Sequence, residues 1–214
     1  GDLVFLVAAE PFGPQQTPRY SERPGEHDNL PVSQKHRFLV IAVNRGDGSI
    51  AWQTEVHEEL PREGAHYTAS LASASPVTDG KNLYVYLGSY GLYCLDFQGR
   101  IVWQKQLGKM HTKHGHGEGA SPLLHDDTLI INWDHEEESF VAAYDAPAGK
   151  EIWRVSREEG TSWATPIVVE HGERSQLIVS GTTAVRGYDL ATGEVIWECG
   201  GLSSNVVASP VAEL

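Results

Sequence analysis

Hydrophobic and polar residues alternate in short runs along this chain, and turn-forming residues separate the runs. One stretch shows the pattern well, with apolar-rich runs at 83–87, 92–96 and 101–106, Asp79-Gly80 before the first run and Gly99 before the last. A period of two is typical of β-strands, and Asp and Gly favour tight turns. The small residues of Ala74–Val77 add an inner strand. The pattern therefore predicts units of four antiparallel strands, and no stretch has the periodicity of a helix.

A dipeptide of Ser or Thr followed by Pro recurs along the chain at almost constant spacing. Its four copies are Ser75-Pro76, Ser121-Pro122, Thr165-Pro166 and Ser209-Pro210, at intervals of 46, 44 and 44 residues, and an Ala precedes each copy. A period in the forties that carries strand patterns is typical of β-propeller blades. We therefore predict an all-β propeller of four-stranded antiparallel blades, with about four blades in this chain.

A second spacing, Gly-x-x-x-Trp, occurs once in each unit. Its copies are Gly48/Trp52, Gly99/Trp103, Gly149/Trp153 and Gly193/Trp197. The Gly ends a hairpin that opens with Asp or Asn, where a left-handed residue is needed. The Trp falls on the outer strand, where a large ring covers a neighbouring blade and its indole N–H requires one acceptor. These residues are predicted to dock adjacent blades, in a WD40-like arrangement.

The segments "AYDAPAGKEIW" and "GYDLATGEVIW", combined with "ASP" or "ATP", resemble the pyrroloquinoline-quinone-like (PQQ-like) propeller repeat. Quinoprotein dehydrogenases share this repeat with non-enzymatic relatives such as the propeller lipoprotein of outer-membrane assembly. The chain also resembles quinoprotein-like propellers of planctomycete-type bacteria. The resemblance covers nearly the whole chain except about residues 10–36, and it implies a periplasmic or otherwise extracytoplasmic location. It is specific for the fold and weak for function.

The repeats divide the chain into blades at about 1–54, 72–107, 118–155 and 162–198, with 10–36 as a long loop insertion. Residues 206–214 match the first strand of a blade, and Leu3–Ala8 matches a second strand, so 206–214 is predicted to complete the first blade. Three readings stay open: the ends pair within one chain, two chains form a homodimeric ring, or further blades of a longer chain close the ring. We favour the last.

The composition and net charge of the chain limit the classes of molecule that it can bind. The chain has 214 residues, 40% of them hydrophobic, and a formal net charge of −13. Nucleic acid is an unsuitable partner for this charge, whereas cationic ligands, metal ions and basic peptides suit it. No segment is long and apolar enough for a transmembrane helix. Cys94 and Cys199 have no metal-binding spacing, and they are either buried small side chains or a disulfide.

Most histidines fall in loops that the propeller topology places on one face. His111, His114 and His116 lie in a Gly-rich stretch, and Asp134 and His135 follow a second strand. Imidazoles with a carboxylate can hold Zn²⁺ or another transition metal, so these five residues are weak candidates for a metal site. The alternative, which we favour, is that they line the channel and bond water and neighbouring loops. His116 and Trp163 are weak candidates for contact with a cofactor.

Two functions from different classes fit the sequence. The first is a non-catalytic scaffold that binds a protein, a peptide or a small ligand at its His- and acid-rich loop face. The second is a quinone- or metal-dependent oxidoreductase, or a fragment of one, with PQQ or a divalent metal as cofactor. The sequence lacks adjacent cysteines, a c-type haem motif and the G-x-S-x-G and H-E-x-x-H signatures. We therefore favour the scaffold, with no catalytic residue assigned.

Overall fold

The computed structural model describes residues 1–20, 23, 25–172 and 174–212. The chain divides into two compact units, Gly1–Gly119 (unit 1) and Ala120–Leu214 (unit 2). The described residues of each unit form two antiparallel sheets, and within every sheet each strand pairs with the next one along the chain. This up-and-down order is the predicted order of the strands in a blade.

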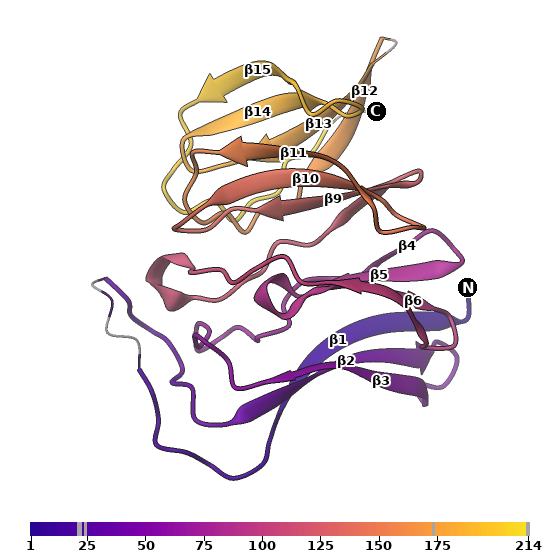
Figure 1. Ribbon diagram of the computed structural model, residues 1–214, viewed down its shortest axis with the longest axis vertical. Helices are drawn as coiled ribbons and strands as arrows, with labels where there is room; N and C mark the ends of the chain where they lie inside the picture. The colour runs from indigo at the N-terminus through magenta and orange to yellow at the C-terminus, as the bar shows by residue number, and fades with distance from the viewer. Residues whose placement is uncertain (21–22, 24, 173, 213–214) are drawn as a thin grey trace. The chain divides into compact units, whose positions relative to one another are not determined.

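The first sheet of unit 1 consists of β1 (Leu3–Phe12), β2 (Lys35–Asn44) and β3 (Ile50–Glu59). β1 and β2 pair over their whole length, from Leu3 opposite Asn44 to Phe12 opposite Lys35. The strands therefore reach into the ends of the predicted 10–36 loop. The connection is residues 13–34, called the insertion below, and Figure 1 shows its described residues continuing from the end of β1 and leading into β2.

The second sheet of unit 1 consists of β4 (Val77–Thr78), β5 (Asn82–Tyr86), β6 (Leu92–Asp96) and β7 (Ile101–Lys105). A short 3₁₀ turn, Gly88–Tyr90, lies between β5 and β6, and a second, Lys113–Gly115, lies in the segment that follows β7. From the sequence, the inner strand was expected to begin at Ala74. In the structure it begins at Val77. Pro76 has no backbone N–H to donate, so the ladder starts after it.

Unit 2 repeats this plan twice. Its first sheet is β8 (Leu123–His125), β9 (Thr128–Trp133), β10 (Ser139–Asp145) and β11 (Glu151–Arg157). Its second sheet is β12 (Ile167–His171), β13 (Arg174–Ser180), β14 (Ala184–Asp189) and β15 (Val195–Gly200). Both inner strands again begin directly after the repeated Pro.

The hairpin before each outer strand adopts the predicted conformation. The four repeated glycines have positive φ angles of 75°, 81°, 65° and 76° at Gly48, Gly99, Gly149 and Gly193. In the third repeat, Asp145 accepts hydrogen bonds from Gly149 N at its carbonyl (2.7 Å) and from Ala148 N at its carboxylate (2.8 Å). Glycine adopts this backbone without the steric penalty that a Cβ brings.

Each unit has its own hydrophobic core. In unit 1 the core packs Phe38 and Val40 of β2 with residues of the second sheet, among them Leu83, Val85 and Tyr93. In unit 2 it packs residues of β9 and β10 with residues of β13 and β14. Alternate residues of the middle strands supply these side chains, which is why the alternation in the sequence predicts the strands correctly.

The repeated Ser/Thr-Pro pairs are linked by hydrogen bonds in unit 2. Ser121 N donates to Thr165 Oγ1 (3.1 Å), and Thr165 N donates to Ser209 Oγ (2.9 Å). Trp163 N also donates to Val206 O (2.8 Å). Residues 206–209 thus lie beside residues 162–165. The first sheet has three strands among the described residues, so its completion by residues 206–214 stays a prediction.

Two further sequence-based expectations concern single features. Both cysteines are free thiols, Cys94 buried and Cys199 exposed, so the disulfide alternative is wrong and only Cys94 is a buried small side chain. The described residues contain no helix long and apolar enough to cross a membrane.

Candidate functional site

Trp52 of β3 reaches from the first sheet of unit 1 to the hairpin of the second. Its indole N–H donates to Phe97 O at 2.9 Å, and the neighbouring Thr54 hydroxyl donates to Gly99 O at 2.7 Å. A Cβ on Gly99 would lie 2.8 Å from ring carbon Cε3 of Trp52. The ring therefore rests directly on the glycine, and the Trp of one repeat and the Gly of the next form one contact.

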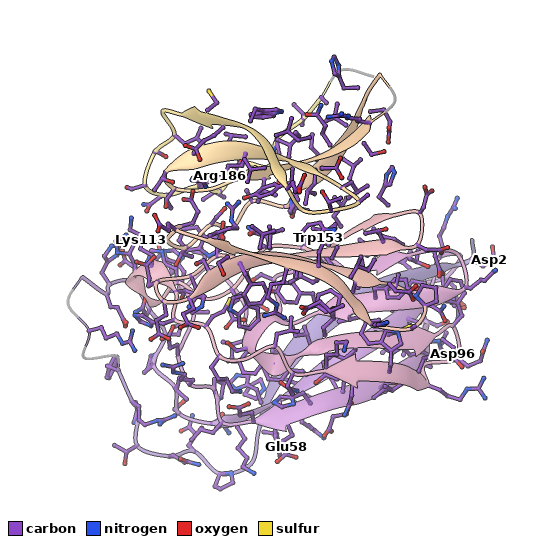
Figure 2. The ribbon with its side chains drawn as sticks, turned by 45° about the horizontal axis from the view of Figure 1, so that its top comes forward. Asp2, Glu58, Asp96, Lys113, Trp153 and Arg186 are labelled. Carbon is purple, nitrogen blue, oxygen red and sulfur yellow. The ribbon has the colours of Figure 1, made fainter. Side chains whose placement is uncertain are left out.

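Trp153 makes the same contact in unit 2. Its indole N–H donates to Leu190 O at 2.9 Å, and a Cβ on Gly193 would lie 2.7 Å from its Cε3. Figure 2 labels Trp153 on the ribbon of this unit. Two independent pairs of sheets thus share one arrangement of Trp, Gly and carbonyl oxygen.

Trp103 and Trp197, the other two repeated tryptophans, each contact a residue of their own sheet. Trp103 of β7 is half-buried, and its ring centroid lies 6.2 Å from that of Tyr84 in the same sheet. Trp197 of β15 is 38% exposed, and its indole N–H donates to Gln176 Oε1 of the same sheet at 2.8 Å. The sequence gives no reason to separate Trp197 from the other three.

The insertion is fixed to the loops of unit 1 by backbone hydrogen bonds. Leu30 N donates to Ala65 O and Tyr67 N donates to Asp28 O, both at 2.9 Å. His66 N in turn donates to His116 O at 3.1 Å. Three segments therefore meet, residues 25–34, 61–71 and 110–118, and together they form what we call the loop face of unit 1.

Four histidines gather on this loop face. The ring centroids of His27 and His114 lie 4.6 Å apart, and that of His116 lies 5.1 Å from His27 and 5.2 Å from His114. His66 joins the group at 4.7 Å from His116. His114 and His116 were predicted candidates. His27 comes from the insertion, 87 residues before His114, and the sequence could not show which residues it would meet.

Hydrogen bonds orient three of these rings. His114 Nδ1 donates to Gly25 O (2.9 Å), His116 Nε2 donates to His27 O (3.1 Å), and His27 Nδ1 donates to Asp28 Oδ2 (3.1 Å). Burial, helped by the neighbouring imidazoles, lowers the pKa of His116 against the opposing effect of its bond to His27 O. The cluster therefore favours the neutral form of its central ring.

A group of carboxylates lies beside the histidine cluster. His111 Nδ1 bonds Glu63 Oε1, and Thr112 N donates to Glu63 Oε2 at 3.2 Å. Glu118 accepts hydrogen bonds from the backbone N–H (2.6 Å) and the hydroxyl of Ser89. Burial raises the pKa of Glu118 to about 7, against the opposing effect of the bonds from Ser89. Glu118 is thus a carboxyl group that can gain or lose its proton near neutral pH.

Two large pockets open among the described residues of the loop face. The first, of about 370 Å³, lies between the insertion and Arg62–Gly64, and polar residues such as Arg19, Glu26 and Glu63 line it. The second, of about 460 Å³, lies between the ends of β1 and β2, residues 30–34 and the 61–71 segment. Its wall is mainly apolar and includes Pro11, Pro31 and Leu71. Both volumes fall in the range of sites for small ligands and peptide side chains.

Asp134 and His135 lie in unit 2 and have partners of their own there. Asp134 binds the buried Arg157 through two bonds, from Nε (2.8 Å) and Nη2 (3.0 Å), and Arg157 Nη1 also donates to the hydroxyl of Tyr188. His135 Nε2 donates to Glu138 O at 3.1 Å. The paired Asp134 has a raised pKa because burial outweighs the opposing charge of Arg157.

A second buried carboxylate of unit 2, Glu159, has strong donors. Its oxygens accept bonds from Thr183 N (2.7 Å), the Thr183 and Thr182 hydroxyls and the guanidinium of Arg186, which Figure 2 labels. Burial alone would raise its pKa, but these bonds together lower the pKa of Glu159 to about 2. Glu159 therefore fixes the turn between β13 and β14 as a carboxylate.

Of the five predicted metal candidates, His111, His114 and His116 belong to unit 1, and Asp134 and His135 belong to unit 2. Over residues 1–20, 23, 25–172 and 174–212, no group of three or more His, Cys, Asp and Glu side chains is arranged to hold a metal ion. The sequence analysis missed the carboxylates of Glu26, Glu63 and Glu118 as neighbours of the histidines. Glu118 ends the His-rich stretch and was the one visible signal among them.

The family of this chain follows from comparison with known proteins. The sequence profile of a PQQ-repeat family described as outer membrane protein assembly factor BamB matches residues 36–199, which is most of the chain. The chain belongs to this family. BamB of Yersinia pestis is 22% identical over 185 residues, which are 82% of this chain and 42% of that protein. This confirms the resemblance to the PQQ-like repeat.

Solved structures of BamB-like and quinoprotein propellers share the fold. BamB from Moraxella catarrhalis aligns over 80% of this chain and 48% of its own, with a TM-score of 0.53 and 20% identity. A europium-containing methanol dehydrogenase aligns over 94% of this chain and 44% of its own, with a TM-score of 0.56 and 13% identity. The predicted partial β-propeller of about four blades is confirmed. The BamB-like chain spans less than half the length of these relatives.

Proposed function

We propose that this BamB-like chain is a non-catalytic propeller segment that binds a protein or peptide partner through the loop face of unit 1. One observation carries the proposal: the insertion is held by backbone hydrogen bonds against loops of sheets that Trp52 joins together. Loops held on a stiff scaffold form a surface that loses little entropy on binding. The loop face also offers two pockets and a mixture of charged and apolar groups for recognition.

The repeated tryptophans supply the stiffness in this proposal. Trp52 and Trp153 each cover a glycine of the next sheet and donate to a carbonyl there. We assign them as docking residues between adjacent blades, and we assign Gly99 and Gly193 as the positions on which their rings rest. Trp103 and Trp197 hold the equivalent register in their own repeats. An extracytoplasmic location fits the family description, which names outer-membrane protein assembly.

Site-specific photo-crosslinking in the native organism tests the binding face. A photoreactive residue at position 67, where the exposed Tyr67 lies on the loop face, should give a discrete protein adduct. The same residue at Gln98, in the hairpin at the opposite end of the strands, should give none. Equal labelling from both positions, or none from position 67, would refute the proposed face.

A quinone-dependent oxidoreductase is the second candidate. It is favoured by the fold that the chain shares with methanol dehydrogenase and with quinohemoprotein alcohol dehydrogenase from Comamonas testosteroni, which aligns over 95% of this chain with a TM-score of 0.52. His116 and Trp163 are its weak candidates for contact with the cofactor. Reconstitution with PQQ and Ca²⁺ should produce a quinoprotein absorbance spectrum and alcohol oxidation if this candidate is right.

A further inference from the structure

The more polar of the two pockets on the loop face contains buried acceptors that lack donors. Glu26 lies on the wall of the 370 Å³ pocket with a side chain only 6% exposed. Its Oε2 accepts a hydrogen bond from Asn29 Nδ2 at 3.3 Å. Its Oε1 is buried and has no hydrogen-bond donor in the described part of the chain. The His111 ring nitrogen Nε2 lies 3.9 Å from this oxygen, which is within range of an ion pair when the ring is protonated but beyond hydrogen-bond distance.

Asn29 likewise has a buried oxygen for which the structure describes no hydrogen-bond donor. Its Oδ1 is also buried and has no donor among the described residues, although its Nδ2 is used by Glu26. The two acceptors therefore belong to side chains that touch each other. Both side chains lie close to the backbone of Gly115, because a Cβ on Gly115 would lie 2.6 Å from Asn29 Nδ2 and 2.8 Å from Glu26 Oε2.

Buried acceptors without donors are unfavourable, and a carboxylate oxygen is the most unfavourable of them. A ligand that brings several N–H donors into this place removes the penalty for both oxygens. A positively charged donor gains more than a neutral one, because charge-assisted bonds to a carboxylate are the stronger kind. Glu63 on the same wall and the net charge of −13 also favour a positively charged ligand.

The other residues of the pocket wall indicate which kind of molecule bears the positive charge. Arg19, Arg23 and Arg62 also line the pocket, and Arg19 Nη2 already donates to Pro61 O at 3.1 Å. Guanidinium groups repel a free cation and attract carbonyl or carboxylate oxygens. A peptide with a basic side chain meets both requirements. The charged head of the side chain donates to the buried oxygens, and the backbone carbonyls of the peptide face the arginines.

We propose that this pocket binds a Lys or Arg side chain of a peptide segment, with Glu26 and Asn29 accepting from its charged head. The inference deepens the proposed function, since it names the chemistry of the partner at the loop face. It can fail while the crosslinking result stands, in which case the partner binds elsewhere on the same face.

Binding of short peptides by isothermal titration calorimetry tests the proposal. Acetyl-Gly-Lys-Gly-amide should bind, and the same peptide with norleucine in place of Lys should bind at least tenfold more weakly. n-Butylammonium should also bind more weakly than the Lys peptide. Equal affinity for the Lys and norleucine peptides, or no binding of the Lys peptide at millimolar concentration, would overturn the proposal. If butylammonium equals the peptide, a free amine and not a peptide is the ligand, and the proposed source is wrong.

Two variants of matched charge separate the pocket from general electrostatics. Glu26→Gln should weaken the Lys peptide at least tenfold, whereas Glu58→Gln should change its affinity less than twofold. Glu58 lies on β3 with its side chain 40% exposed and paired with Lys35, and Figure 2 labels it. Equal effects of the two variants would mean that only net charge matters.

The stability of the peptide-free protein gives an independent readout. Because Glu26→Gln removes a buried carboxylate with one oxygen that lacks a hydrogen-bond donor among the described residues, the melting temperature of this variant should rise in the absence of peptide. A fall in the melting temperature would show that Glu26 has a structural partner, such as an internal water, and would contradict a site that is prepared for a ligand.

Discussion

The ring of Trp52 lies on Gly99 with no room for a side chain between them. Gly99 has a φ of 81° and belongs to the hairpin of the second sheet, whereas Trp52 belongs to the first. Gly48 occupies the same position of its own hairpin with a φ of 75°, and a Cβ there would meet nothing within 4 Å. The two glycines thus share a backbone conformation and differ in what covers them.

This difference predicts the effect of replacing each glycine by alanine. Gly48→Ala should lower the free energy of unfolding by about 1 kcal/mol, the penalty of a left-handed non-glycine residue. Gly99→Ala carries the same penalty and also displaces the Trp52 ring, so it should lower stability by about 2–4 kcal/mol. Urea denaturation measures both values. Equal losses would mean that the ring does not rest on Gly99 in solution.

Replacing the tryptophans tests docking in unit 2. Trp153→Ala removes a ring that covers another sheet and should lower the free energy of unfolding by about 3–5 kcal/mol. Trp197→Ala removes a ring that is 38% exposed and bonds within its own sheet, so it should lower stability by about 1 kcal/mol. Thermal and urea unfolding of both variants provide the comparison. A loss below about 1 kcal/mol for Trp153→Ala would exclude a docking role.

Glu118 predicts a pH dependence of stability near neutrality. Its pKa is raised to about 7 in the folded protein from 4.5, chiefly by burial. The stabilisation by its protonated form is therefore complete below pH 4.5 and is lost as the pH rises through 7. Between pH 5 and pH 8 the loss of stabilisation should be about 1–3 kcal/mol. Glu118→Gln should remove this part of the dependence in urea titrations at the two pH values.

Glu159 predicts a dependence of the opposite sign. Despite its burial, bonds from Thr183, Arg186 and Thr182 lower its pKa to about 2 from 4.5. Its stabilisation is present above pH 4.5 and is lost as the pH falls toward 2, with a magnitude of about 2–3 kcal/mol. Glu159→Gln should lose this stability at pH 6 and differ little from the parent protein at pH 2. An equal deficit at both pH values would show that the lost charge is not the cause.

The sequence predicts the sheets better than the loops, for a physical reason. Alternation reports which side of a strand is buried, so β5, β6 and β7 lie within a residue of their expected positions. The hairpin glycines follow from backbone sterics alone. The bonds from Ser121 to Thr165 and from Thr165 to Ser209 were not foreseen, because a Ser-Pro pair does not show which neighbour its hydroxyl will meet.

The candidate site was predictable only in part. His114 and His116 were recognised from their spacing, but their neighbour His27 and the carboxylate of Glu26 come from the insertion, which has no periodicity. The contacts of such a segment depend on which loops it packs against, and the local sequence pattern does not predict this packing. The exposure of Trp197 is likewise a property of what lies beside β15 and not of its own repeat.

The way in which the insertion is attached has a consequence for how this protein can change. Main-chain groups hold it at Leu30–Ala65 and at Asp28–Tyr67, and almost any amino acid supplies the same N–H and C=O. Substitutions along the insertion can therefore alter the lining of the two pockets on the loop face without shifting the path of the main chain. Related proteins with this anchorage can acquire new preferences one side chain at a time, while the sheets beneath stay as they are.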